Sequence, residues 1–294
     1  MVTAGDGARP AAAGRAPSRS APPAQADAPL LRLHGIGKNF GPVHALADID
    51  LDIPEGQVTA LVGDNGAGKS TLIKTISGIW EPTSGEILWN GKTVHLHGPK
   101  DATDLGIATV YQDLALCDNL DIVQNMLLGH EVLRRGLLDE VSMELIAKRT
   151  LTDLKVVTVR SIRQPVGSLS GGQRQSVAVA KAVMLDARLV IMDEPTAALG
   201  VSQTELVLSL IGRLAGRGHA VIVISHNLTE VFQVADRIAV LYLGRLAAAG
   251  PASDFDTQSV VELMTTGTSA RLRVGNGNAG QPAPLGGRGS GTEG

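Results

Sequence analysis

The stretch GDNGAGKST (residues 63–71) constrains the fold of this chain more than any other sequence feature. It matches G-x-x-x-x-G-K-[ST] and lies between the apolar run QVTALVG (57–63) and the helical pattern KSTLIKTISGI (69–79). Its glycines let the backbone wrap around phosphates, whose charge is favoured by N–H groups and the start of a helix. Lys69 can reach the β- and γ-phosphates, and the Ser70 hydroxyl can bind Mg²⁺. The stretch therefore predicts a nucleoside triphosphate site rather than an ordinary glycine-rich turn.

The composition predicts one folded region between two tails. Residues 1–28 and 269–294 are rich in Ala, Pro, Gly, Ser and Arg, so neither can bury enough apolar surface to offset its ordering entropy. The remaining stretch of about 240 residues is long enough for one large α/β domain. Hydrophobic residues make up 44% of the chain and aromatic residues only 2%, which predicts an aliphatic core.

Charge and hydropathy narrow the classes of partner. A net charge of −3 gives no electrostatic reason to expect a nucleic-acid partner. There is no apolar run of about 18 residues, so we expect a soluble protein that meets the membrane only through another protein. The single cysteine, Cys117, fits a reducing cytoplasm. The first 28 residues fit a solvated tail better than an Arg- and Ser-containing organellar presequence.

Hydrophobic periodicity predicts the order of the elements. Alternating patterns at 30–36 and 43–53, and a strand pair at 85–98 around Asn90-Gly91, are typical of half-exposed antiparallel strands. Apolar runs at 57–63, 107–112, 188–193, 220–225 and 237–242 favour strands of a buried parallel sheet, with helices at 201–216 and 227–235. Apolar spacing of three and four residues predicts a helical insertion at about 113–186.

Two adjacent acids follow the buried run LVIM. In DEPTAALGV (193–201), Asp193 is placed to bind Mg²⁺ beside Ser70, and Glu194 to polarise the water that attacks the γ-phosphate. The alternative is that both acids are only the solvated end of a strand. A further stretch, SLSGGQRQS (168–176), puts two glycines at the start of a helix after Ser170, which indicates a second anion-binding helix terminus or an ordinary capped helix.

In combination, GDNGAGKST, LSGGQ and LVIMDE resemble the motifs of the ATP-binding-cassette (ABC) superfamily, in its order and over about residues 30–266. The resemblance implies an α/β P-loop NTPase fold with a mixed, mostly parallel sheet, an antiparallel β subdomain and a helical subdomain, the ATPase domain spanning 29–268. It also implies ATP and Mg²⁺ as cofactors. In this family ATP lies between two chains, which implies a homodimer.

The resemblance assigns further residues by position. Gln112 matches the glutamine that contacts Mg²⁺ and the attacking water, His226 the histidine that touches the γ-phosphate, and Phe40 the aromatic that stacks on adenine. The catalytic set is thus Glu194, His226 and Gln112, and the metal set Ser70, Gln112 and Asp193. The nucleotide-binding set is Phe40, Gly63, Asp64, Asn65, Gly66, Ala67, Gly68, Lys69, Ser70, Thr71, Ser170, Gly171, Gly172 and Gln173.

Two classes of cassette protein compete: the ATPase subunit of a transporter, and a soluble ATPase that acts on ribosomes or DNA. One cassette, a helical insertion of only about 70 residues and no basic patch favour the transporter. The stretches VYQDLALCDNLDIVQNMLLG, LSGGQRQSVAVAKAV and DEPTAALGV resemble bacterial importers of ribose, xylose or fructose. This implies permease subunits, an extracytoplasmic sugar-binding protein and a place at the cytoplasmic face of the membrane. The sugar is not readable from this chain.

One position departs from the superfamily pattern. Most cassettes carry an aspartate where this chain has Gly200, and that aspartate contacts the opposite subunit near its phosphate-binding loop. A degenerate site is one explanation. Because the other catalytic elements are present, and single-cassette sugar importers share the glycine, we expect an active ATPase whose subunits communicate without that carboxylate.

Overall fold

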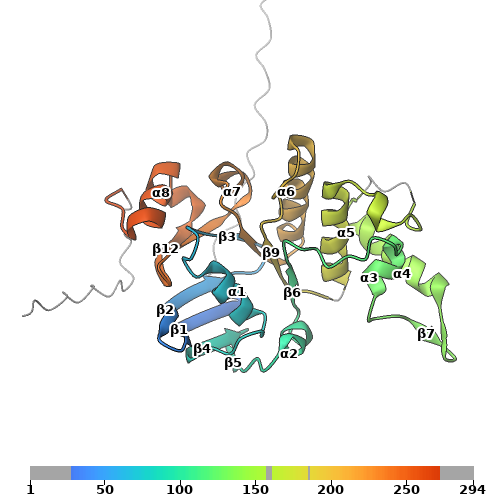
Figure 1. Ribbon diagram of the computed structural model, residues 1–294, viewed down its shortest axis with the longest axis horizontal. Helices are drawn as coiled ribbons and strands as arrows, with labels where there is room; N and C mark the ends of the chain where they lie inside the picture. Colours follow the sequence, from blue (N-terminus) through green and yellow to red (C-terminus); the bar gives the residue numbers. More distant parts are fainter. Residues whose placement is uncertain (1–27, 157–160, 185, 272–294) are drawn as a thin grey trace, which may run out of the picture.

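The computed structural model describes residues 28–156, 161–184 and 186–271. The predicted tails at 1–28 and 269–294 lie outside the described residues, apart from Ala28 and residues 269–271. Two large sheets, a two-stranded hairpin and a set of helices make up the described part (Figure 1).

The larger sheet carries most of the apolar runs. Its strand order is β12-β11-β3-β10-β9-β6. These strands are Arg245–Pro251 (β12), Arg237–Tyr242 (β11), Val58–Gly63 (β3), Ala220–Ile224 (β10), Leu189–Asp193 (β9) and Ile107–Val110 (β6). All neighbouring pairs are parallel except β11 with β12, which is antiparallel. The predicted buried parallel sheet is confirmed, because β3 and β10 are buried along their whole length.

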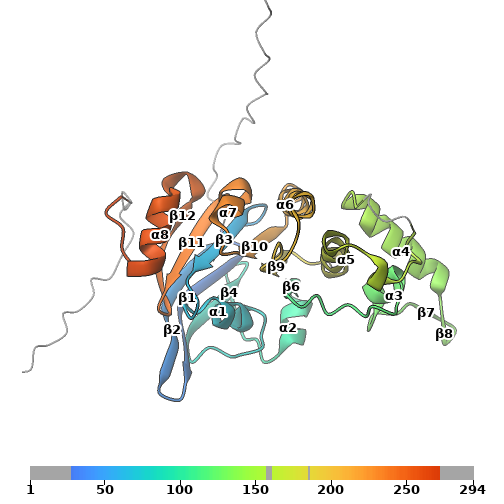
Figure 2. The ribbon, with the colours of Figure 1, turned by 45° about the horizontal axis from the view of Figure 1, so that its top comes forward.

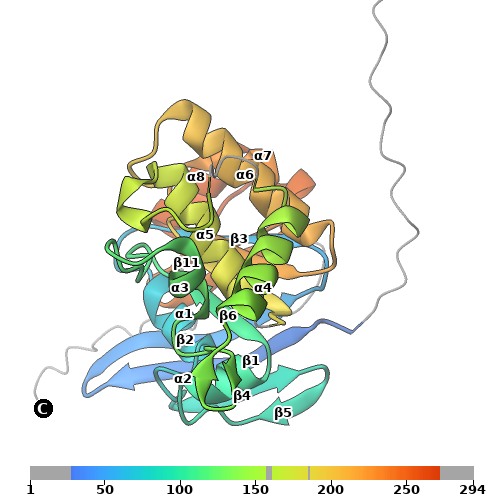
Figure 3. The same ribbon diagram turned by 90° about the vertical axis from the view of Figure 1, so that its right-hand side faces the viewer.

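The smaller sheet is antiparallel, as the alternating patterns predict. Its order is β2-β1-β4-β5, formed by Val43–Ile53 (β2), Leu31–Phe40 (β1), Ser84–Trp89 (β4) and Lys92–Val94 (β5). Figure 3, which looks from the side of the helices, places it below the large sheet. The helices that accompany the two sheets are Lys69–Ile76 (α1), Pro99–Asp104 (α2), Val201–Ala215 (α6), Leu228–Val234 (α7) and Thr257–Thr266 (α8).

The remaining helices form an arm beyond β6 and α6 (Figure 2). This helical arm contains Ile122–Leu127 (α3), Glu140–Asp153 (α4) and Gly171–Met184 (α5), with single 3₁₀ turns at Val166–Ser168 in the arm and at Ala252–Asp254 before α8. It also holds a two-residue hairpin, Leu133–Arg134 (β7) with Leu137–Leu138 (β8), where only helices were expected. The hairpin forms because Arg135 and Gly136 both adopt positive φ, 54° and 82°, as a tight primed turn requires.

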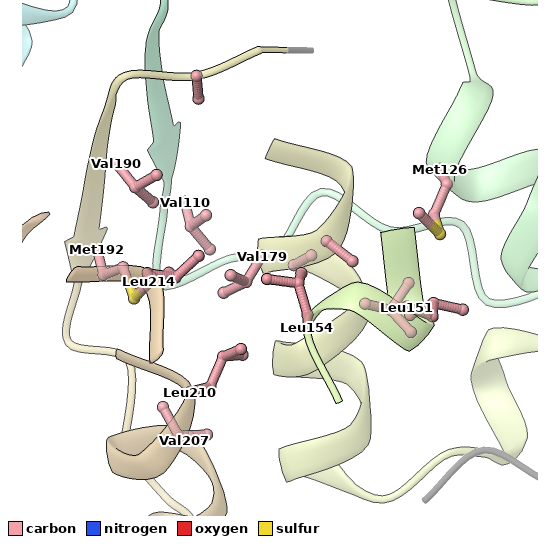
Figure 4. Close-up of a cluster of buried hydrophobic side chains, with 14 of the residues drawn as sticks. Val110, Met126, Leu151, Leu154, Val179, Val190, Met192, Val207, Leu210 and Leu214 are labelled. Atoms are coloured by element: carbon pink, nitrogen blue, oxygen red, sulfur yellow. The ribbon is translucent and has the colours of Figure 1, made fainter. Parts of the chain in front are cut away.

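The core is aliphatic, as predicted. Among the described aromatic side chains only Trp89 and Phe255 are buried. One apolar cluster runs from the large sheet through α6 and α5 into the arm, and Figure 4 shows Val110 and Val190 of the sheet on one side of Val179 and Leu151 on the other. The arm and the sheet therefore share packed side chains, which fixes the start of α5 relative to the ends of the strands.

Candidate active site

The parallel strands place the predicted chemistry along one edge of the large sheet. The carboxyl ends of β3, β10, β9 and β6 point the same way, and ligands of open α/β sheets bind outside such ends. Gly63 ends β3, Asp193 ends β9, and His226 and Gln112 each follow β10 or β6 by two residues. Four segments that are distant in the sequence therefore meet at this edge.

The phosphate-binding loop (residues 63–71) joins β3 to α1. Glycine is required at Gly63 and Gly68, which have φ of 158° and 104°. A Cβ atom would lie 2.6 Å from the carbonyl oxygen of Leu241 at the first position and 2.9 Å from that of Ala45 at the second. The Nζ atom of Lys69 donates to the carbonyl oxygens of Gly63 at 2.7 Å and Asp64 at 3.0 Å. The lysine thus lies across the loop where phosphate oxygens can take the place of these carbonyls.

Opposite charges lie close together in partly buried surroundings. Burial lowers the pKa of Lys69, against the raising effect of Glu194, Asp64 and Asp193. Burial also raises the pKa of Asp193, with a further rise from Glu194, while Lys69 and Lys74 lower it. A desolvated ammonium group favours an anion, and a desolvated carboxylate favours a cation. These residues therefore fit a nucleotide phosphate together with a divalent cation.

Glu194 and His226 contact each other directly. Nδ1 of His226 lies 2.7 Å from Oε2 of Glu194, and the side chains are 73% and 20% exposed respectively. The backbone N–H of Glu194 donates to the carbonyl oxygen of Ile224 at 3.0 Å, which ties the end of β9 to the end of β10. Two residues assigned to catalysis from separate motifs are thus brought into one pair.

Most of the other predicted residues of this edge are exposed. Ser70, Gln112, Asp64, Asn65 and Gly66 are exposed. Ala67 is buried and Thr71 is intermediate. No group of three or more His, Cys, Asp or Glu in the described ranges can hold a metal ion by itself.

Phe40 has an aromatic neighbour that the sequence did not reveal. Its ring is 40% exposed and lies edge-to-face with Trp80, with ring centroids 4.7 Å apart. The ammonium of Lys38 lies 5.3 Å from the Phe40 ring and that of Lys74 lies 4.8 Å from the Trp80 ring. The two rings are separated by 40 positions, so no local pattern pairs them.

The start of α5 lies apart from the phosphate-binding loop, on the far side of β6 (Figure 1). The N–H of Ser170 donates to Oε1 of Gln173 at 2.9 Å, and the N–H of Gln173 to the hydroxyl of Ser170 at 3.4 Å. Gly171 and Gly172 lie close to α6 and to the turn before it: an added Cβ at Gly171 would lie 2.7 Å from Leu199 Cδ2 and 3.2 Å from Gln203 Oε1, and one at Gly172 would lie 3.0 Å from Gln203 Cβ. The glycines of LSGGQ thus allow α5 and α6 to approach each other.

Comparison with known proteins identifies the family that this chain resembles. The ABC transporter family model matches residues 46–197. The chain is 44% identical over 247 residues to the fructose import ATP-binding protein FrcA of Rhizobium meliloti, covering 82% of this chain and 95% of that protein. It is 42% identical to the xylose/arabinose import ATP-binding protein XylG of Sulfolobus acidocaldarius, covering 84% and 98%. A ribose import ATP-binding protein of Rubrobacter xylanophilus is 42% identical, and the match spans 80% of this chain but 47% of that protein.

Solved structures agree with this result. The fold resembles cbiO1 of Clostridium perfringens, part of an ABC transporter complex, with a TM-score of 0.68, 26% identity, and coverage of 81% and 96% of the two chains. It also resembles a dimeric ATP-binding cassette in a post-hydrolysis state bound to ADP and Pi, with a TM-score of 0.64, 26% identity, and coverage of 76% and 100%. Since sequence, fold and the layout of the sheet edge agree, the chain belongs to the ABC transporter family and is one of its ATP-binding ATPase cassettes.

Proposed function

We propose that this cassette energises the import of a monosaccharide across the cytoplasmic membrane. The observation that carries the proposal is the 44% identity with a fructose import protein over 95% of its length, supported by the 42% identity with a xylose/arabinose import protein. No helix in the described ranges is long and apolar enough to cross a membrane. In this proposal the cassette acts with permease subunits at the cytoplasmic face, and an extracytoplasmic binding protein delivers the sugar to them.

The proposed roles of the residues follow from their places at the sheet edge. Lys69 and the backbone of the phosphate-binding loop hold the phosphates, and Phe40 stacks on the adenine. Glu194 polarises the attacking water, with Gln112 and His226 on the γ-phosphate side. Mg²⁺, when bound between Ser70, Gln112 and Asp193, supplies charge neutralisation for the phosphates. The raised pKa of Asp193 supports this, because a desolvated carboxylate gains from a cation nearby.

A homodimer completes each ATP site in this proposal. Ser170, directly before α5, is exposed and lies outside the chain's own phosphate-binding loop, which supports its facing the nucleotide of a second copy together with the segment up to Gln173. The ATPase domain then comprises about residues 29–268, with its helical subdomain at about 113–186.

Sugar uptake and co-purification test the proposal together. Deletion of the gene is expected to abolish high-affinity uptake of one pentose or hexose, measured with a panel of labelled sugars. Purification of the tagged chain from detergent-solubilised membranes is expected to recover a permease. Unchanged uptake across the panel contradicts sugar import, and recovery of ribosomes instead of a permease favours a soluble cassette ATPase.

A further inference from the structure

The turn that follows β9 has a conformation that needs outside support. Glu194 and Ala198 adopt φ of 50° and 61°, in the left-handed region that non-glycine residues seldom occupy. Such residues persist only where their surroundings hold them. Two backbone bonds contribute: the N–H of Ala197 donates to the Glu194 carbonyl at 3.1 Å, and the N–H of Glu194 to Ile224 at 3.0 Å. The second bond ties Glu194 to the end of β10, two residues before His226, but neither bond reaches the residues that follow His226.

The side chain of Glu230 connects the turn to the residues after His226. Glu230 lies in the first turn of α7 and is partly buried. Its Oε2 accepts a hydrogen bond from the hydroxyl of Thr196, and its Oε1 accepts one from Nδ2 of Asn227 at 2.8 Å. Thr196 lies two residues after Glu194, and Asn227 directly follows His226. The carboxylate therefore bridges the two segments whose side chains form the Glu194–His226 pair.

We propose that Glu230 is a positioning residue for ATP hydrolysis, which holds the turn bearing Glu194 against the segment bearing His226. The proposal rests on the catalytic roles assigned above to those two residues. Hydrogen bonds to an ionised carboxylate are shorter and stronger than neutral ones, so one side chain can hold both segments. Glu230 acts through Thr196 and Asn227.

A purely helix-capping role for Glu230 is the competing explanation. Asn227 already caps α7, because its Oδ1 accepts from the N–H of Thr229 at 3.1 Å. Replacing Asn227 with Asp keeps that cap, since Asp and Asn are equally good at the position, but removes the donor to Glu230 and adds a like charge. This variant therefore breaks the bridge while leaving the cap of the helix intact.

The experiment is steady-state ATP hydrolysis by the purified full-length chain, with kcat and KM measured separately. A displacement of about 1 Å at a catalytic group can cost about 100-fold in rate. We expect Glu230→Ala, Thr196→Val and Asn227→Asp each to lower kcat by about tenfold or more, with KM for ATP changed less than about twofold. Glu230→Gln should retain most of kcat, because its amide can accept from Asn227 and donate to the Thr196 hydroxyl.

Two comparisons make the test specific. Glu86→Ala is the matched control, because Glu86 also accepts a hydrogen bond from a threonine hydroxyl, that of Thr93 at 3.1 Å, but in the antiparallel sheet. It should leave kcat unchanged. The double variant Glu230→Ala/Thr196→Val should be no slower than the slower single variant, since both remove the same contact.

The outcomes separate this inference from the proposed function. If Glu194→Gln is inactive while Glu230→Ala and Asn227→Asp keep the wild-type kcat, Glu230 has no positioning role and the assignment of Glu194 stands. The inference is also overturned if these variants change only the KM for ATP and not kcat. The same holds if the double variant lowers kcat by the product of the two single effects. If Glu194→Gln hydrolyses ATP at the wild-type rate, the proposed site itself is wrong. Should Glu230→Ala fail to fold, Thr196→Val and Asn227→Asp carry the same test.

Discussion

Nδ1 of His226 lies 2.7 Å from Oε2 of Glu194, at the ends of two adjacent parallel strands, β10 and β9. The contact occupies one oxygen of the carboxylate that we assign to polarise water. We expect that oxygen to become available to water when Nδ1 of His226 contacts another acceptor, such as a phosphate oxygen. The pair therefore links the two residues on which hydrolysis depends in the proposed site.

Glu194→Gln is expected to bind ATP, accumulate the closed dimer and nearly stop hydrolysis, because an amide cannot accept the proton of the attacking water. Phosphate release measures the rate, and size-exclusion chromatography with ATP measures the dimer. Glu86→Gln is the matched control. If Glu194→Gln hydrolyses ATP at the wild-type rate, another residue polarises the water.

Lys69→Ala is expected to raise the Kd for ATP by about 10- to 100-fold, because hydrogen bonds to charged groups contribute about 1.5–3 kcal/mol. Isothermal titration calorimetry on the purified chain measures the change. Lys92→Ala, on exposed β5, removes the same charge far from the loop and should leave Kd unchanged. Equal affinities for the wild type and Lys69→Ala exclude a phosphate contact by this lysine.

Asp193→Asn is expected to stabilise the nucleotide-free protein at neutral pH. Burial raises the folded-state pKa of Asp193 above its unfolded-state value. Between these two pKa values the folded state therefore binds more protons than the unfolded state. The free energy of unfolding therefore falls as the pH rises from the unfolded-state pKa to the folded-state pKa. At higher pH this loss of stability remains. Replacing the carboxylate by an amide removes the deficit. Because Asp193 is only partly buried, solvent screens the effect.

The corresponding rise in Tm is expected to be about 2 °C, since about 1 kcal/mol moves Tm by roughly 2–4 °C in a domain of this size. Thermal unfolding followed by circular dichroism measures it, with exposed Asp104→Asn as the control. The difference between variant and wild type should shrink as pH approaches the ordinary carboxyl range. A lower Tm for Asp193→Asn at neutral pH contradicts the assigned direction.

Gly200→Asp is expected to change the cooperativity of hydrolysis without disturbing the fold. Gly200 is the N-cap of α6, with extended backbone (φ −74°, ψ 162°), and an added Cβ would meet no heavy atom of the described residues within 4 Å. Asn and Asp are equally good N-caps, so Gly200→Asn is a neutral control of the same size. Hill coefficients for ATP compare the two variants. Identical coefficients for wild type, Asn and Asp show that a carboxylate at this position has no influence on the dimer.

Gly200 is also a position where the structure adds to what the sequence suggested. From the sequence we expect subunits that communicate without a carboxylate at Gly200. In the described chain an added Cβ at Gly200 would meet no heavy atom within 4 Å, whereas one at Gly171 or Gly172 would lie close to Leu199 or Gln203. The structural requirement for a glycine is seldom visible in the sequence, because it depends on which atoms of other segments pack against that position.

The phosphate-binding loop and the acids after β9 could be predicted because their geometry is local. A buried strand, a loop rich in glycine and a helix start occur within residues 57–79, and the strand alone places Asp193 at a sheet edge. The contact between Glu194 and His226 could not be predicted, because it requires β10 to lie beside β9. The bridge from Glu230 to Thr196 spans 34 positions, and only the pattern N-x-x-E at 227–230, typical of a helix cap, marked Glu230 in the sequence.

The sequence by itself determined most of the element types, the buried strands and the motifs, since periodicity and motif spacing are properties of short segments. Tertiary structure alone decided the strand order, the contact between Phe40 and Trp80, and the bridge through Glu230. The physical reason is that strand pairing and side-chain packing depend on residues far apart in the chain. Their energies are settled only when the whole core closes around them.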